Sequence, residues 1–184
     1  MGFLSKAELN KIGFKSLGNN VFISDKASFY SPGTIIIGSN VRIDDFCILS
    51  GNIKLGNYIH ISAYCGLYGK GGIEMGNFSG LSPRCTLLSA SDDFSGQFMI
   101  SPMVSEEFTN VQFGNIKIGE FAQIGAGTVL LPNVNIAKGS VVGAMSLVKK
   151  NTEEWKIYGG TPAKFLKHRK KNLKDLSKRF LKED

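Results

Sequence analysis

The stretch "LLSASDDFSG", residues 87–96, places two adjacent carboxylates directly after small and apolar residues. A positioned carboxylate can take a proton from an attacking nucleophile, so Asp92 is the first candidate for a general base. Asp93 is a candidate for substrate binding, but its side chain points away from that of Asp92 if the strand continues, and capping of the loop is the alternative. Both residues could instead fold the start of a loop, since aspartate side chains often bond to nearby backbone.

A second candidate proton acceptor is His60, one of two histidines in the chain. It precedes Ile61, a predicted core residue, so its side chain should point outward, towards a substrate or a second subunit. A structural hydrogen bond is the alternative. The other histidine, His168, lies in a basic segment and is expected to belong to that surface. Two histidines, and three cysteines without CxxC spacing, do not make a zinc set, so no metal is expected.

Three further charged residues are candidates for substrate binding. Arg84 comes shortly before the two aspartates and could hold a phosphate through two parallel hydrogen bonds. Glu106 and Glu107 could contact the substrate if their segment crosses to another subunit. For all three residues a solvated surface position is the alternative.

The elements that must position these residues follow a six-residue repeat. Aliphatic residues recur at this spacing at Ile37, Ile43, Leu49, Leu55, Ile61 and Leu67, then two residues out of step at Met75, Leu81 and Leu87, and later at Ile118, Ile124, Leu130, Ile136, Val142 and Val148. Neither a helix nor an alternating strand has this period. Coils with three flat six-residue sides do, and they would stack Ile37, Leu55 and Met75 on one another. The glycine-rich residues 69–72 can absorb the two extra positions in a bulged corner.

The repeat predicts an all-β solenoid, a left-handed parallel β-helix of hexapeptide repeats, over residues 15–152. Glycine, asparagine and aspartate are expected at its corners, where a positive φ costs them little. A non-repeating loop should interrupt the coils at about residues 92–114. A loop of this length in a compact solenoid is usually functional or disordered, and its aromatic residues argue against disorder.

Both ends of the chain depart from the repeat. Residues 1–14 should contain a short helix, with Ser5 and Glu8 as a capping box and Gly13 as its end. Residues 153–184 should form a closing strap and a C-terminal helix. The apolar side of that helix is expected to carry Leu166, Leu173, Leu176 and Phe180.

The net charge of +7 lies mostly at the C-terminal end, where residues 164–184 hold nine lysines and arginines against three acids. Such a segment is typical of a solvated basic helix or of a surface that meets phosphate, nucleic acid or anionic lipid. The hypothesis that the protein binds nucleic acid is supported by this charge alone, since the sequence contains no recognised nucleic-acid-binding module. No apolar run reaches the roughly 18 residues of a membrane span, the first residues lack signal-peptide features, and the cysteine usage suits a cytoplasmic protein.

The coils, the loop and the segment "IGAGTVLLPNVNIAKGSVVGAMSLVKKN…YGGTPAKFLKHR" resemble the hexapeptide acyltransferases that use acyl-CoA, over about residues 15–169. Within that family, "RIDDFCILSGNIKLGNYIHISAYCGLYG" and "DDFSG" are similar to N-acyltransferases of nucleotide-linked amino sugars, such as that of anthrose biosynthesis. The acceptor there is a dTDP-linked 4-amino-4,6-dideoxyglucose. Many family members carry a histidine where Asp92 stands, so the resemblance places Asp92 in the catalytic position with a different base.

The resemblance also implies a coenzyme A groove. Ala126, Gly127 and Ala144 would let the pantetheine arm approach the backbone, although corner geometry alone could explain their small size. Thr161, Pro162 and Ala163 match the segment beside adenine. Lys164 and Arg169 are candidates for the 3′-phosphate.

The function implied is acyl transfer, with acetyl-CoA or another acyl-CoA as co-substrate, to the amino group of a nucleotide-linked 4-amino-4,6-dideoxy sugar for bacterial surface polysaccharide synthesis. Like the family, the protein is expected to be a cytoplasmic homotrimer with active sites between subunits. A sugar O-acetyltransferase, or a structural or binding solenoid that has lost catalysis, are the alternatives.

Overall fold

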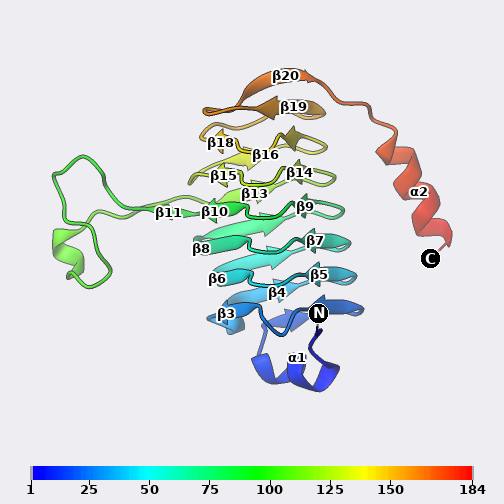
Figure 1. Cartoon of the computed structure of the whole chain (residues 1–184), viewed down its shortest axis with the longest axis horizontal. Helices are drawn as coiled ribbons and strands as arrows, with labels where there is room; N and C mark the ends of the chain where they lie inside the picture. Colours follow the sequence, from blue (N-terminus) through cyan, green and yellow to red (C-terminus); the bar gives the residue numbers. More distant parts are fainter. Residues whose placement is uncertain (1, 184) are drawn as a thin grey trace.

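The computed structural model describes residues 2–183 and contains one parallel β-helix of about seven turns (Figure 1). The predicted parallel β-helix is therefore confirmed. Each turn has three sides, and the strands of successive turns pair in parallel along each side. No helix within residues 2–183 is long and apolar enough to cross a membrane.

The first side is formed, in chain order, by β2 (Val21–Ile23), β5 (Val41–Ile43), β7 (Ile59–Ile61), β9 (Gly80–Leu81), β14 (Gln123–Ile124), β17 (Val141–Val142) and β19 (Lys156–Gly159). The second side is formed by β3 (Ser28–Tyr30), the first halves of β6 (Ile48–Leu55) and β8 (Gly66–Met75), β10 (Thr86–Leu88), β15 (Val129–Leu130) and β18 (Leu147–Val148). The third side is formed by β1 (Ser16–Leu17), β4 (Ile35–Ile37), the second halves of β6 and β8, β13 (Ile116–Ile118) and β16 (Asn135–Ile136). The 3-10 turn η1 (Pro32–Thr34) precedes β4.

The core is the column of aliphatic side chains that the repeat predicted. Leu55 pairs with Ile37 on one neighbouring turn and with Met75 on the other, and all three are at most 3% exposed. Fully burying one such side chain stabilises the fold by about 1.5–3 kcal/mol. The predicted bulge is also present, because Gly51 pairs with Gly69 while Ile53 pairs with Ile73, which leaves two extra residues at that corner.

The corners differ from the expectation that glycine, asparagine and aspartate would fill them. Six aromatic residues also have a positive φ between 55° and 63°, namely Phe46, Tyr58, Tyr64, Phe78, Phe121 and Trp155. This conformation is unfavourable for a bulky side chain. Ring stacking between turns offsets the cost, as where the Tyr58 and Phe78 centroids lie 4.7 Å apart with nearly parallel planes. Such pairs contribute about 0.5–1.5 kcal/mol beyond the area they bury.

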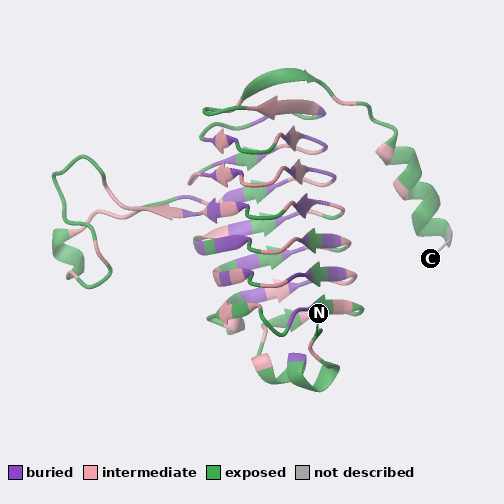
Figure 2. Cartoon of the chain, in the orientation of Figure 1, coloured by how far each residue is buried: buried purple, intermediate pink, exposed green. Residues whose placement is uncertain are grey.

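The loop leaves the body where the second and third sides meet. β11 (Ala90–Ser91) pairs antiparallel with β12 (Gln112–Phe113), and the 3-10 turn η2 (Glu106–Phe108) lies between them. The loop extends away from the coils, and most of it is exposed (Figures 1 and 2).

The two ends of the solenoid are covered by different elements. Helix α1 (Lys6–Ile12) begins at the predicted capping box of Ser5 and Glu8 and ends at Gly13. At the other end β20 (Lys164–His168) folds back antiparallel on β19, and helix α2 (Leu173–Glu183) follows.

The placement of Leu166 on the C-terminal helix was wrong. Leu166 lies on β20, because the last turn offers an unpaired strand, β19, with which residues 164–168 form a ladder. The helix starts seven residues later, at Leu173, and its Phe180 ring packs edge-on against Tyr58.

Candidate active site

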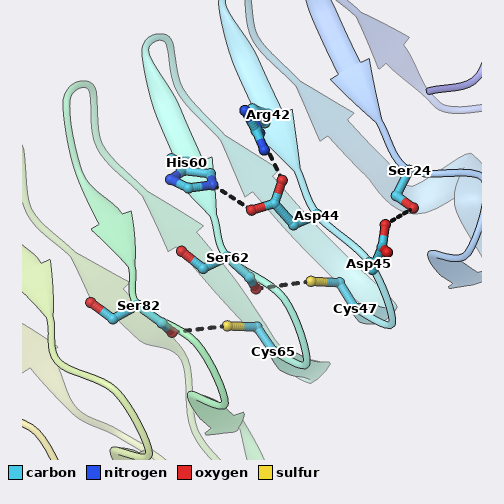
Figure 3. A network of polar contacts seen from close by, with 9 residues as sticks. All are labelled: Ser24, Arg42, Asp44, Asp45, Cys47, His60, Ser62, Cys65 and Ser82. Carbon is cyan, nitrogen blue, oxygen red and sulfur yellow. Dashed lines mark hydrogen bonds and ion pairs between the residues drawn. The ribbon is translucent and has the colours of Figure 1, made fainter. Parts of the chain in front are cut away.

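His60 lies on the outer face of the first side, as predicted, with about half of its side chain exposed. Its Nε2 is 2.7 Å from Oδ2 of Asp44, and the other oxygen of that carboxylate accepts a hydrogen bond of 2.7 Å from Nε of Arg42 (Figure 3). One turn of the solenoid separates these residues, since Arg42 on β5 pairs with His60 on β7. The three side chains therefore form one connected polar group.

The state of Asp44 decides what His60 can do. Partial burial alone would raise the pKa of Asp44, but hydrogen bonds from Arg42 and His60 outweigh it and hold that pKa below its usual value. An ionised carboxylate only accepts, so Nε2 of His60 must carry the proton. The neutral ring then has its lone pair on Nδ1, which has no partner within residues 2–183. His60 is thus oriented as a proton acceptor.

Sequence reasoning missed Asp44 and Arg42. The available signal was the coil length, because Arg42 and His60 are 18 residues apart and must therefore be neighbours on successive turns. A charged residue on the turn next to a histidine that is predicted to point outward is a reason to look for a hydrogen bond or ion pair with that histidine. Asp44 was harder to find, since its side chain bends from the strand end towards the turn above (Figure 3).

Asp92 lies at the base of the loop, directly after β11, and is half-buried. Its carboxylate has no hydrogen-bond partner in the part of the chain that the structure describes. Ser89, three residues earlier, is tied to the bulged corner through a hydrogen bond from the Gly71 amide. The carboxylate is therefore held near that corner and is free to meet another molecule.

Asp92 and His60 lie on opposite sides of a single chain. His60 is on the first side, and Asp92 follows the corner between the second and third sides, which faces away from it (Figure 1). One chain alone does not bring the two candidate bases together. A second copy, packed with its first side against this corner, would do so.

The other predicted substrate-binding residues are spread over two regions. Asp93 caps its own loop, since its Oδ1 accepts a hydrogen bond of 2.7 Å from the Ser95 amide. Hydrogen bonding to this carboxylate lowers the pKa of Asp93. Glu106 and Glu107 are exposed on η2 at the far part of the loop. Arg84 is exposed on the body, with its guanidinium 5.6 Å from the ring centroid of Tyr64. The binding roles of these residues stay predictions.

The small residues assigned to coenzyme A gather on one corner. The Met145 amide donates to the Ala126 carbonyl on the turn below, and the Thr161 hydroxyl donates to the Met145 carbonyl. Gly127 has φ +68°, and a Cβ there would meet the Met145 sulfur at 2.5 Å. This corner brings together Ala126, Gly127, Ala144, Thr161, Pro162 and Ala163. It offers accessible backbone over two turns, which fits an extended pantetheine arm.

Lys164 and Arg169 lie at opposite ends of β20. Lys164 pairs with Gly159 beside the small-residue corner, and it is exposed. Arg169 lies near the first residue of β19, where its amide donates to the Trp155 carbonyl. Its Nη1 donates to the carbonyls of Phe121 and Gly139 at 2.7 and 2.9 Å. Arg169 therefore holds the chain to the corner from which α2 departs, and its predicted contact with a phosphate would compete with these bonds.

Substitution of these two cations should separate binding from stability. Lys164→Ala is expected to raise the KM for acyl-CoA several-fold at unchanged kcat and unchanged melting temperature, the pattern of lost uniform binding. Arg169→Ala is expected to destabilise the fold by about 1–3 kcal/mol, because two carbonyls lose a charged donor. Steady-state kinetics and thermal unfolding of both variants check this. Equal effects of the two substitutions on the KM for acyl-CoA, with no loss of stability for Arg169→Ala, would contradict it.

The three cysteines are stacked in the interior, where their thiols are inaccessible to a substrate. Cys47 and Cys65 donate to the carbonyls of Ser62 and Ser82 on the next turn (Figure 3). The neighbouring Cys65 and burial raise the pKa of Cys47, which keeps its thiol protonated. The predicted packing role of the cysteines is confirmed for all three, since each is at most 1% exposed.

Comparison with known proteins agrees with this geometry. The family described as bacterial transferase hexapeptide (six repeats) matches residues 115–150. A dTDP-4-amino-4,6-dideoxy-D-glucose acyltransferase from Escherichia coli is 42% identical over 183 residues, which cover 98% of this chain and 95% of that protein. Among solved structures, AntD, an N-acyltransferase from Bacillus cereus in complex with dTDP and 3-hydroxybutyryl-CoA, superposes with a TM-score of 0.96 at 48% identity, covering 98% and 97% of the two chains.

A serine variant of AntD, in complex with dTDP-4-amino-4,6-dideoxyglucose and coenzyme A, gives a TM-score of 0.98 at 47% identity, covering all of this chain and 99% of that one. The chain therefore belongs to the hexapeptide-repeat acyltransferase family. The resemblance inferred from the sequence motifs is confirmed, and the similarity extends from one end of the chain to the other.

Proposed function

We propose that the protein transfers an acyl group from coenzyme A to the 4-amino group of dTDP-4-amino-4,6-dideoxyglucose. The observation that carries this proposal is the small-residue corner, which begins two turns beyond an oriented proton acceptor, His60 on Asp44, in a chain whose relatives act on or bind these two substrates. Transfer of this kind would serve the synthesis of a bacterial surface polysaccharide.

The chemistry needs no covalent enzyme intermediate. The amine nitrogen attacks the thioester carbonyl, the new C–N bond forms, and the C–S bond breaks to release the coenzyme A thiolate. A backbone amide of the corner stabilises the oxyanion of the tetrahedral intermediate. Asp92 or His60 takes the proton that the amine loses, and that proton neutralises the thiolate. The three cysteines are buried in the core, so no thiol is accessible to compete as a nucleophile.

We further propose a homotrimer with active sites between subunits. In its support, the loop carries exposed apolar side chains, among them Phe94 at 79% and Met103 at 91% exposure, which a second copy would cover. The separation of Asp92 from His60 within one chain supports the same arrangement. The exposed loop in Figure 2 is the segment that would reach the neighbouring subunit. The unpaired cysteines suit a reducing compartment, and we assign the enzyme to the cytoplasm.

The direct test is release of coenzyme A thiol from acetyl-CoA and from 3-hydroxybutyryl-CoA, with dTDP-4-amino-4,6-dideoxyglucose as acceptor. We expect turnover with one or both donors and an amide product by mass spectrometry. The matched acceptor, the same dTDP-sugar with a 4-hydroxyl group, should react far more slowly because a hydroxyl is harder to deprotonate. Faster turnover of the hydroxyl sugar would make the enzyme an O-acyltransferase, and no turnover with either acceptor would contradict the proposal.

A further inference from the structure

The C-terminal segment carries a concentration of positive charge that the candidate active site does not use. Between residues 170 and 182 all charged side chains are exposed, and all but one are basic: Lys170, Lys171, Lys174, Asp175, Lys178, Arg179 and Lys182. Helix α2 lies along the corner between the third and first sides, whereas the coenzyme A corner joins the first side to the second. Within one chain, this charge therefore lies apart from the site assigned to the acyl donor.

The inner face of α2 holds the helix to the coils. Leu173, Ser177 and Phe180 line a cavity against the aromatic corner, and the Phe180 ring packs edge-on against the rings of Tyr58 and Phe78. Leu173 and Ser177 are half-buried, while the other side chains of the helix are exposed. These contacts fix which face of the helix is turned away from the body.

The outer face of α2 is basic. Successive residues of a helix are about 100° apart, so Lys178, Arg179 and Lys182 project opposite the inner face. None of the three takes part in an ion pair within residues 2–183. Leu176 and Leu181 flank them and are 53% and 51% exposed, and Figure 2 shows the helix beside the coils with most of its surface open. We refer to Lys178, Arg179 and Lys182 as the basic face.

The shape of the basic face indicates what it can bind. A phosphate group is held by donors that converge on it, whereas these three cations diverge from the convex surface of one helix. An extended anionic surface can contact all three at once. Helices that combine basic residues with exposed leucines lie on anionic lipid surfaces for this reason.

We propose that the basic face of α2 docks the protein on an anionic lipid bilayer, with its side chains at the lipid phosphates and the two flanking leucines at the headgroup boundary. Such binding is peripheral and reversible. Each basic residue near an anionic leaflet strengthens it by about fivefold in affinity. No residue of the basic face belongs to the candidate active site, so docking is independent of the proposed chemistry.

The test is co-sedimentation of the whole chain with lipid vesicles. We expect binding to vesicles of equal parts phosphatidylcholine and phosphatidylglycerol, and none to phosphatidylcholine alone. Raising the ionic strength to about 0.5 M should release the protein, because salt screens the attraction. The triple variant Lys178→Gln, Arg179→Gln, Lys182→Gln should bind about a hundredfold more weakly at low salt, with an unchanged melting temperature.

A matched variant separates the position of the charge from its amount. Lys6→Gln, Lys54→Gln and Lys117→Gln remove as many exposed lysines from α1 and the third side, and this variant should bind anionic vesicles within about threefold of the wild type. Wild-type protein that does not sediment with anionic vesicles, or equal losses for the two triple variants, would overturn the inference while leaving the turnover assay unaffected.

Two further outcomes would assign the basic face to another ligand. The α2 variant should keep the kcat and the KM for acyl-CoA of the wild type in solution. A raised KM would instead mean that the basic face serves the donor bound to a neighbouring subunit. Tighter binding of the wild type to a DNA duplex than to anionic vesicles, at the same salt, would mean that the face binds nucleic acid. Either result contradicts docking on lipid.

Discussion

Asp92→Asn should lower kcat by about 10²–10⁴-fold, the usual worth of acid–base catalysis. Asparagine keeps the size of the side chain but cannot take a proton. The Kd for acyl-CoA should barely change, because a general base meets the reacting end of the donor, away from the coenzyme A nucleotide. Single-turnover kinetics with the amino sugar measure this effect on the chemical step.

His60→Asn is the paired measurement. If His60→Asn abolishes turnover while Asp92→Asn stays active, the roles are reversed, and the polar group of Asp44 and His60 provides the base. If neither substitution slows turnover more than a few-fold, the amine arrives neutral. The pH–rate profile would then follow the pKa of the substrate alone.

Mixing the two inactive variants should restore activity. In an interface site, Asp92 comes from one subunit and His60 from its neighbour, so a mixed trimer contains some sites with both residues intact. Random assembly from equal amounts of Asp92→Asn and His60→Asn chains should recover about a quarter of wild-type activity. The measurement is turnover after the two chains are unfolded and refolded together.

Separately refolded variants, combined only afterwards, are the control and should stay inactive as long as subunits do not exchange. Activity that remains absent after joint refolding, with trimers confirmed by sedimentation, would show that both residues act within one chain or that only one of them acts. A stable and active monomer would exclude the interface site altogether.

The solenoid was predictable from the sequence because a six-residue period has few structural solutions. The stacking of Ile37 on Leu55 and Met75 follows from the spacing of these residues, because stacking buries their side chains. The aromatic corners were not predictable in the same way. A positive φ at Tyr64 conflicts with its own backbone preference and is stabilised by a ring one turn away, which is a tertiary effect.

Only part of the candidate site was predicted from the sequence, because some of its contacts are also tertiary effects. Motif resemblance drew attention to Asp92 and to the small residues of the coenzyme A corner. The contact between Asp44 and His60 depends on the bend of one side chain towards the next turn, which no sequence pattern encodes. Arg169 shows the opposite case, since a residue chosen for its charge is occupied by two backbone carbonyls.

The return of β20 along β19 has a consequence for how the molecules associate. A parallel solenoid that simply stopped would expose a row of unpaired amides and carbonyls, a template on which the first turn of another copy could continue the ladder. β20 occupies that row and presents lysines at positions 164 and 167 along the new border, and charged edge strands discourage further pairing. Strand addition on the first side, and with it growth along the solenoid axis, is thereby disfavoured. Copies are left to meet through their flanks, where a closed ring with a fixed number of subunits can form.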